Sequence, residues 1–148
     1  MEAVARFVAF GALISLTSFV TRRACGGLEG SATDVPLRPP GWVFGVVWPI
    51  LFVTTGIAWA TASGGELDVP LSIVTALCCA WLVVYSCLGR KGVAAGVLVS
   101  SCLAAGFSAA VGKRNASRWL LAPLVAWTAF ASYLNLYDAV ASSAPCRA

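Results

Sequence analysis

The chain has 148 residues, of which 59% are hydrophobic and only 11% are charged, and its mean hydropathy is +0.86. A soluble domain of this size cannot bury that much apolar surface, so the composition excludes a soluble globular protein and indicates an integral membrane protein. The formal net charge of +4 comes from basic residues scattered over short links. Such scattering is typical of membrane-flanking positions and not of a nucleic-acid surface.

Five apolar stretches are long enough to cross a hydrocarbon core of about 30 Å, which needs about 20 residues. They are 4–20, 42–62, 69–88, 92–111 and 119–137. The first stretch runs into Arg22 and Arg23 without a small-residue cleavage site, so we interpret it as a spanning helix and not as a secretory signal. The expected fold is all-α, an integral membrane bundle of five transmembrane helices in one domain covering residues 1–148.

The link between the first two spans, residues 21–41, is the only long one and is rich in Gly, Ser, Asp and Pro. It is long enough to fold over one mouth of the bundle as a lid. It ends in Pro39 and Pro40, and each proline restricts the residue before it, so this turn is not helical. The second span therefore begins after a rigid turn.

The basic residues give a weak orientation signal. On the side of the N-terminus lie Arg6, Lys113, Arg114 and Arg118. On the other side lie Arg22, Arg23, Arg38, Arg90, Lys91 and Arg147. The positive-inside rule favours the more basic side as the cytoplasmic one, which predicts a cytoplasmic C-terminus.

The six cysteines do not form a CxxC pair, and the chain has no histidine. Cys78, Cys79, Cys87 and Cys102 fall within the expected spans. We therefore expect no metal site, and we interpret these four residues as small buried hydrophobes. Cys25 and Cys146 lie outside the spans and are open to modification.

Two kinds of chemistry are disfavoured. No Asp, Glu, Lys or Arg lies in the middle of a span, which argues against an ion-coupled transporter or pump. Without histidine, the Ser and Thr residues have no partner base within the membrane, so hydrolytic chemistry is not expected.

The spans carry aromatic and amide side chains at helical spacing instead. Three helices can each aim one indole inward, from Trp48, Trp81 and Trp127, and Asn135 lies on the same broad helix face as Trp127. For any one of these tryptophans taken alone, a packing role is the simpler interpretation, and Asn135 could equally bond to a neighbouring helix.

Three further tryptophans lie near span ends, where indoles commonly act as packing residues or interfacial anchors. They are Trp42, Trp59 and Trp119. For these three the packing or anchoring role is favoured.

Two motifs carry a family resemblance. The first reads Pro39-Pro40-x-Trp42-Val43-Phe44-Gly45-x-Val47-Trp48-x-x-Leu51-Phe52, followed by Gly56. The second reads Pro123-x-x-Ala126-Trp127-x-x-Phe130-Ala131-x-x-Leu134-Asn135. They resemble the second-helix and fifth-helix signatures of the translocator protein family, also called tryptophan-rich sensory proteins or peripheral benzodiazepine receptors. The order of the motifs, the five spans and the long first link agree, so the resemblance covers nearly the whole chain.

The resemblance implies a pocket that opens toward the first link and binds tetrapyrroles such as protoporphyrin IX, heme, or other hydrophobic molecules. The ligand-binding positions that it implies are Phe44, Gly45, Val47, Trp48, Cys78, Trp81, Trp127, Ala131, Leu134 and Asn135. Some family members break down bound porphyrin oxidatively in light, which gives Trp48 and Trp127 an implied catalytic role. No cofactor or metal is required, and without histidine heme would bind only as a flat hydrophobe.

The chain also departs from the family pattern. It has Leu37 and Phe52 where the family usually has Trp and Tyr, and Cys78 and Val97 at positions that are often Asn and acidic. After Tyr137 comes Asp138 with no nearby basic residue, so the sterol-contact pattern is not satisfied. These differences favour porphyrin over sterol as a ligand.

Small residues suggest where the chain could associate with a second copy. Ala76 and Ala80 on the third span, like Gly92 and Gly96 on the fourth, are spaced for close helix approach, either within the bundle or between copies. The family resemblance implies a homodimer that uses the third span, which favours Ala76 and Ala80.

Three functions stay open at this stage. The first is a receptor or sensor for tetrapyrroles. The alternative is a transporter of porphyrin, or of a sterol or other lipid, without ion coupling. A third interpretation is an assembly protein without a small ligand. Family members occur in bacterial envelopes, the mitochondrial outer membrane and plant secretory membranes, and no targeting signal here selects among them.

Overall fold

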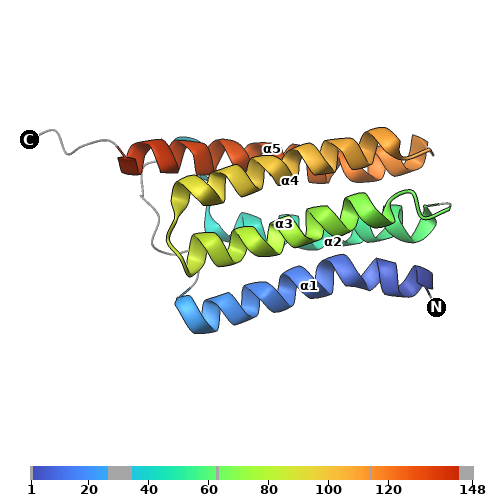
Figure 1. Ribbon diagram of the computed structural model, residues 1–148, viewed down its shortest axis with the longest axis horizontal. Coiled ribbons are helices and arrows are strands. Elements are labelled where there is room, and N and C mark those ends of the chain that lie inside the picture. Colours follow the sequence, from blue (N-terminus) through green and yellow to red (C-terminus); the bar gives the residue numbers. More distant parts are fainter. Residues whose placement is uncertain (1, 27–34, 63, 114, 144–148) are drawn as a thin grey trace, which may run out of the picture.

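The computed structural model describes residues 2–26, 35–62, 64–113 and 115–143. Within them lie five α-helices: α1 (Glu2–Cys25), α2 (Gly41–Thr61), α3 (Asp68–Ser86), α4 (Lys91–Val111) and α5 (Asn115–Ser143). All five are long and apolar enough to cross a membrane, and no strand occurs in these residues. The prediction of an all-α bundle of five transmembrane helices is confirmed (Figure 1).

Two helices are longer than the expected spans. The stretch expected at 4–20 is α1, Glu2–Cys25, and the stretch expected at 119–137 is α5, Asn115–Ser143. Arg22 and Arg23 lie in the last turn of α1, where positive charge stabilises the partial negative charge of a helix C-terminus. Both helices therefore extend beyond the apolar stretches and include the polar residues that flank them.

The five helices form a closed ring in the order α1, α2, α5, α4, α3. Each helix has two principal neighbours, and the ring closes because α3 packs against α1. Figure 1 agrees, with α1 along one edge of the bundle and α4 and α5 along the opposite edge. The interior is thus bordered by all five helices, and helices distant in sequence contribute side chains to one space.

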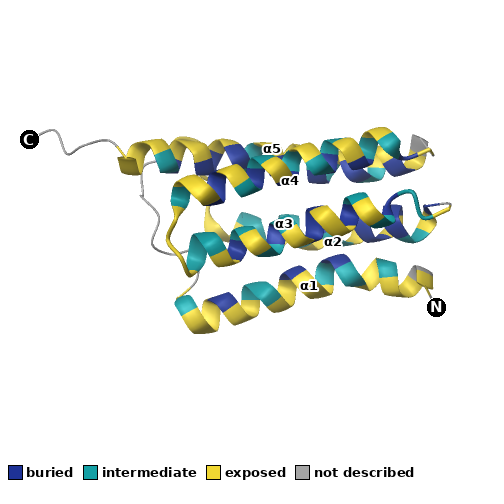
Figure 2. Cartoon of the chain, viewed as in Figure 1, coloured by how far each residue is buried: buried dark blue, intermediate teal, exposed yellow. Residues whose placement is uncertain are grey.

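The two ends of the bundle differ in what they contain. We call the end at which α1, α3 and α5 finish and α2 begins the loop face, and we call the other end the opposite face. The half near the opposite face contains the largest fully buried apolar side chains, and Figure 2 shows where the buried residues lie along the helices. The fully buried ones include Phe10, Leu67, Leu71, Leu121 and Leu124. This half is the hydrophobic core.

A close crossing of α1 and α2 explains one glycine of the second-helix motif. A Cβ atom at Gly56 would lie 2.7 Å from the backbone oxygen of Phe7 on α1. That distance leaves no room for a side chain, so glycine at this position lets the two backbones approach.

One carboxylate near each face joins helices through polar contacts. At the opposite face, Asp68 at the start of α3 accepts hydrogen bonds from Arg6 Nη2 on α1 and from Trp59 Nε1 on α2, each at 2.7 Å. Trp59 is buried, so it is a packing residue of the bundle. Trp42 and Trp119 are exposed, which is consistent with interfacial anchors.

At the loop face, Asp138 on α5 is buried and accepts hydrogen bonds from Tyr85 Oη on α3 at 2.9 Å and from Lys91 Nζ on α4 at 3.0 Å. These contacts join α3, α4 and α5. The basic partner that Asp138 lacks in the sequence around it therefore comes from another helix.

A disulfide corrects one prediction. Cys25, the last residue of α1, is bonded to Cys87, which directly follows α3, and their Cα atoms are 5.1 Å apart. The interpretation of Cys87 as a small hydrophobe inside a span is wrong, because α3 ends at Ser86 and its C-terminus meets that of α1 in the ring. Cys78, Cys79 and Cys102 are free thiols. Cys146 and residues 27–34 of the predicted lid lie outside the described residues.

The small-residue patterns face outward. Ala76, Ala80, Gly92 and Gly96 are all exposed, and a Cβ atom at either glycine would have nothing within 4 Å. Gly92 and Gly96 are therefore not needed for close packing within the chain. The homodimer through Ala76 and Ala80 stays a prediction.

The buried ion pair at the loop face makes a stability prediction. Asp138→Asn leaves the Lys91 ammonium without its carboxylate, and removing one partner of a buried ion pair costs about 3 kcal/mol. We expect a clearly lower melting temperature in thermal unfolding of the detergent-solubilised protein. The matched control is Glu2→Gln, since the Glu2 side chain is 87% exposed and 4.0 Å from Arg6. Equal melting temperatures for the two variants would contradict this role of Asp138.

Candidate ligand-binding pocket

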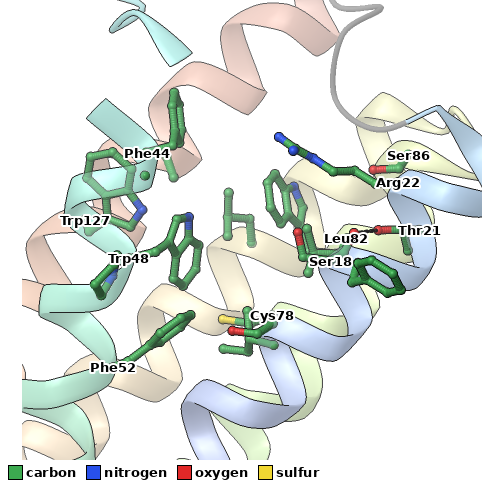
Figure 3. A pocket seen from close by; sticks show the side chains of 18 of the residues that line it. Ser18, Thr21, Arg22, Phe44, Trp48, Phe52, Cys78, Leu82, Ser86 and Trp127 are labelled. Atoms are coloured by element: carbon green, nitrogen blue, oxygen red, sulfur yellow. Dashed lines mark hydrogen bonds between the residues drawn. The ribbon is translucent and has the colours of Figure 1, made fainter. Parts of the chain in front are cut away.

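The loop-face half of the ring encloses a cavity of about 480 Å³. All five helices border it, and its size is within the range of small-molecule sites, about 300–1,000 Å³ (Figure 3). Most of the wall is aromatic or aliphatic. The hollow and the core are therefore two halves of the same ring interior.

Most of the predicted ligand-binding residues meet at this cavity. The ones that line it are Phe44, Gly45, Trp48, Cys78, Trp81, Trp127 and Ala131. The ones outside its lining are Val47, Leu134 and Asn135. The structure thus brings indoles from α2, α3 and α5 to one space, which the spacing within each span predicts only separately.

The regular spacing on α2 explains which of its residues face the cavity. Phe44, Trp48 and Phe52 are four residues apart, so their side chains follow one another along the inner face of the helix. The Trp48 and Phe52 rings are 5.7 Å apart between centroids. Val47 is turned about 100° from Trp48 on the helix, and it packs against the core instead.

The wall formed by α5 combines an indole with a small residue. Trp127 contacts Phe44 of the adjacent helix α2 edge to face, with 5.4 Å between the ring centroids, and this contact joins the two helices at the pocket wall. Ala131, one turn later, has only a methyl group and leaves room beside the indole. Leu134 is buried between helices and does not reach the cavity.

Asn135 positions an indole and does not line the cavity. Its Oδ1 atom accepts a hydrogen bond from Trp81 Nε1 at 2.9 Å, and its Nδ2 atom donates to the backbone oxygen of Ala131 at 3.0 Å. Asn135 therefore bonds to another helix, α3, across the ring, which agrees with its interpretation as a link between helices. The result is that the Trp81 ring is held in one orientation at the pocket wall.

Pro49 leaves one backbone oxygen of α2 without its usual hydrogen bond. Pro49 lies inside the helix and has no N–H, so it cannot make the usual helical hydrogen bond to the backbone oxygen of Gly45, four residues earlier. Both residues line the cavity, and Gly45 has no side chain to cover its own backbone. The Gly45 oxygen thus lacks its usual helical donor at the pocket wall.

The contribution of α1 was missed by sequence reasoning. Its residues along the cavity include Ser15, Ser18, Phe19 and Arg22, and Thr21 lies among them. Ser15, Ser18 and Arg22 are three and four residues apart, so this polar stripe on an otherwise apolar span was the available signal. Polar groups consequently gather at the mouth of the pocket, at the loop face.

The contact between Asn135 and Trp81 makes a testable prediction. Asn135→Leu leaves the indole N–H without an acceptor in a buried place, which costs about 1–3 kcal/mol. We expect the melting temperature to fall and the fluorescence of Trp81 to shift. Trp81→Phe combined with Asn135→Leu removes both partners, so this double variant should recover part of the lost stability. A double variant that is destabilised by the sum of the single effects would contradict the contact.

Comparison with known proteins identifies the family. A sequence profile described as the TspO/MBR family matches residues 3–139, which is most of the chain. A comparison with curated proteins gives no match. The profile covers all five spans and both tryptophan motifs together with the pocket that they form. The chain therefore belongs to the TspO/MBR family.

Proposed function

We propose that the protein is a membrane receptor that binds a flat hydrophobic tetrapyrrole, such as protoporphyrin IX, in the pocket at the loop face. The observation that carries the proposal is the meeting of Trp48, Trp81 and Trp127, from three helices, at one cavity. Membership of the TspO/MBR family supports it at the level of the family.

The chemistry of the wall suits such a ligand. Indole rings offer large flat apolar surfaces, on which an aromatic macrocycle can stack or pack edge to face. Trp81 is held by Asn135 and Trp127 by its contact with Phe44, so two of the three rings are fixed before a ligand arrives. Fixed rings lose little conformational entropy on binding, which favours affinity.

The packed half of the ring favours a receptor over a transporter. Leu67, Leu71, Leu121 and Leu124 are fully buried between the cavity and the opposite face, so these side chains fill the route across the bundle. The described residues that line the cavity also include no Asp or Glu to couple an ion. Transport without ion coupling would require this core to open.

Titration with protoporphyrin IX tests the proposal. We expect saturable binding to the purified protein, followed by the absorbance of the porphyrin, and about tenfold weaker binding for Trp48→Ala and Trp127→Ala because each substitution removes a large apolar contact. Trp119→Ala is the control, since this side chain is 79% exposed and outside the cavity. Absence of binding to the parent protein, or equal loss in the control, would refute the proposal.

Illumination of the same complexes tests the oxidative role proposed for Trp48 and Trp127. Both indoles line the cavity, where dioxygen would be the oxidant and the bound porphyrin would be oxidised. Trp48→Phe and Trp127→Phe retain an aromatic wall, so we expect binding with slower light-dependent loss of porphyrin. Loss at the parent rate in both variants would remove these residues from the mechanism.

The orientation in the membrane is a separate proposal. The charge distribution favours a cytoplasmic loop face, but by only six basic residues against four. The Cys25–Cys87 disulfide lies at that same face, and disulfides persist in oxidising compartments and are rare in the cytosol. On the evidence of the disulfide, we propose that the loop face, with the pocket mouth and the C-terminal end of α5, is turned away from the cytosol.

Protease protection in sealed vesicles with the cytosolic side outward tests this orientation. We expect a tag placed after Ala148 to be protected and a tag before Met1 to be digested. A digest without reductant should also yield the Cys25 and Cys87 peptides joined together. Digestion of the C-terminal tag in intact vesicles would restore the orientation predicted from charge.

A further inference from the structure

We infer that Arg22 binds a carboxylate of the pocket ligand, so the ligand is amphipathic, with a flat apolar body and an acidic group at one edge. The inference rests on the proposed function, because it assigns the chemical class of the ligand in the same cavity. It is carried by the position and charge of Arg22, which the family motifs do not include.

Arg22 lies where an acidic edge of a ligand would emerge. It belongs to the last turn of α1, at the loop face, and it lines the cavity together with the indoles deeper in the ring. In Figure 3 its side chain extends from α1 over the cavity toward the side on which Phe44 and Trp48 lie. A ligand body between the indoles would thus place its outer edge near the guanidinium.

Among the residues that the structure describes, no carboxylate pairs with Arg22. Its side chain has no hydrogen bond or ion pair with any residue that the structure describes, and the described lining includes no carboxylate. The buried carboxylate of this face, Asp138, is already bonded to Lys91 and Tyr85. An uncompensated guanidinium at the mouth of an apolar pocket favours an anionic partner.

Neighbouring arginine residues differ in their surroundings. The Arg23 guanidinium lies 5.4 Å from the centre of the Phe19 ring, where it makes a cation–π contact, and it does not line the cavity. Arg22 and Arg23 thus carry the same charge at adjacent positions, but only Arg22 faces the cavity. This difference provides a matched control.

Hydroxyl groups near Arg22 can complete the site. Ser18 on α1 and Ser86 on α3 line the same mouth, and neither side chain is hydrogen-bonded to a described residue. Each can donate one hydrogen bond to a carboxylate oxygen, while the planar guanidinium can donate two in parallel. A carboxylate fits this set of donors, whereas an ester or amide leaves the positive charge unmatched.

The test compares protoporphyrin IX, which carries two carboxylates, with its dimethyl ester, which has the same macrocycle and no charge. Binding of both is measured in an uncharged detergent, so that no anionic lipid headgroup can occupy Arg22. We expect Arg22→Gln to weaken binding of the diacid roughly tenfold and to leave binding of the ester unchanged. For each ligand, the dissociation constant of the variant is divided by that of the parent protein. This ratio cancels any difference in how the two ligands partition into micelles.

Two further variants test whether the effect depends on a positive charge that lines the pocket or on any positive charge near the end of α1. Arg22→Lys should retain part of the preference for the diacid, because it keeps the charge and loses the planar fork. Arg23→Gln should change neither ligand, because Arg23 does not line the cavity. All variants keep the pocket tryptophans, so unchanged binding of the dimethyl ester also shows that the pocket is intact.

The outcomes distinguish this inference from the function on which it rests. Equal effects of Arg22→Gln on diacid and ester, or the same effect from Arg23→Gln, would overturn the role of Arg22 while the receptor function stands. If the parent protein binds neither porphyrin, both the receptor function and the carboxylate site are wrong.

Discussion

Closure of the helix ring is the constraint on which the rest of the structure depends. With two principal neighbours for each helix, the interior exists only while α1 remains packed between α2 and α3. Lipid is as apolar as the helices, so packing and polar contacts must hold them together. Asp68 joins α1, α2 and α3 at one face, Asp138 joins α3, α4 and α5 at the other, and the disulfide ties α1 to α3 beside the pocket.

The same ring explains why core and pocket coexist in so short a chain. Near the opposite face, leucines from α3 and α5 meet in the centre and exclude any ligand. Near the loop face, small residues such as Gly45 and Ala131 leave space, and aromatic side chains line it. The polar residues of α1 lie at the mouth, so the pocket is apolar at depth and polar at its edge. A flat amphipathic molecule matches that gradient.

Much of the fold and of the pocket wall could be predicted from the sequence, because hydropathy and helical spacing are local properties. The five spans follow from apolar length, and the inward faces of α2 and α5 follow from side chains four residues apart. The order of the helices in the ring depends on contacts between residues far apart in the sequence. The wrong and missing predictions concern residues at those contacts. Apolar length alone puts Cys87 inside a span, because nothing nearby in sequence shows that α3 ends beside Cys25. In the same way, Arg22 reads from the sequence only as a flanking charge, although it lines the cavity.

A structure of the protein with protoporphyrin IX bound would show whether the macrocycle occupies the pocket inside the helix ring. We expect density for one macrocycle inside the ring at the loop-face half, in contact with Trp48, Trp81 and Trp127, with the leucine core unchanged. Density for the porphyrin on the outer surface of the bundle, with the cavity free of it, would contradict binding in this pocket.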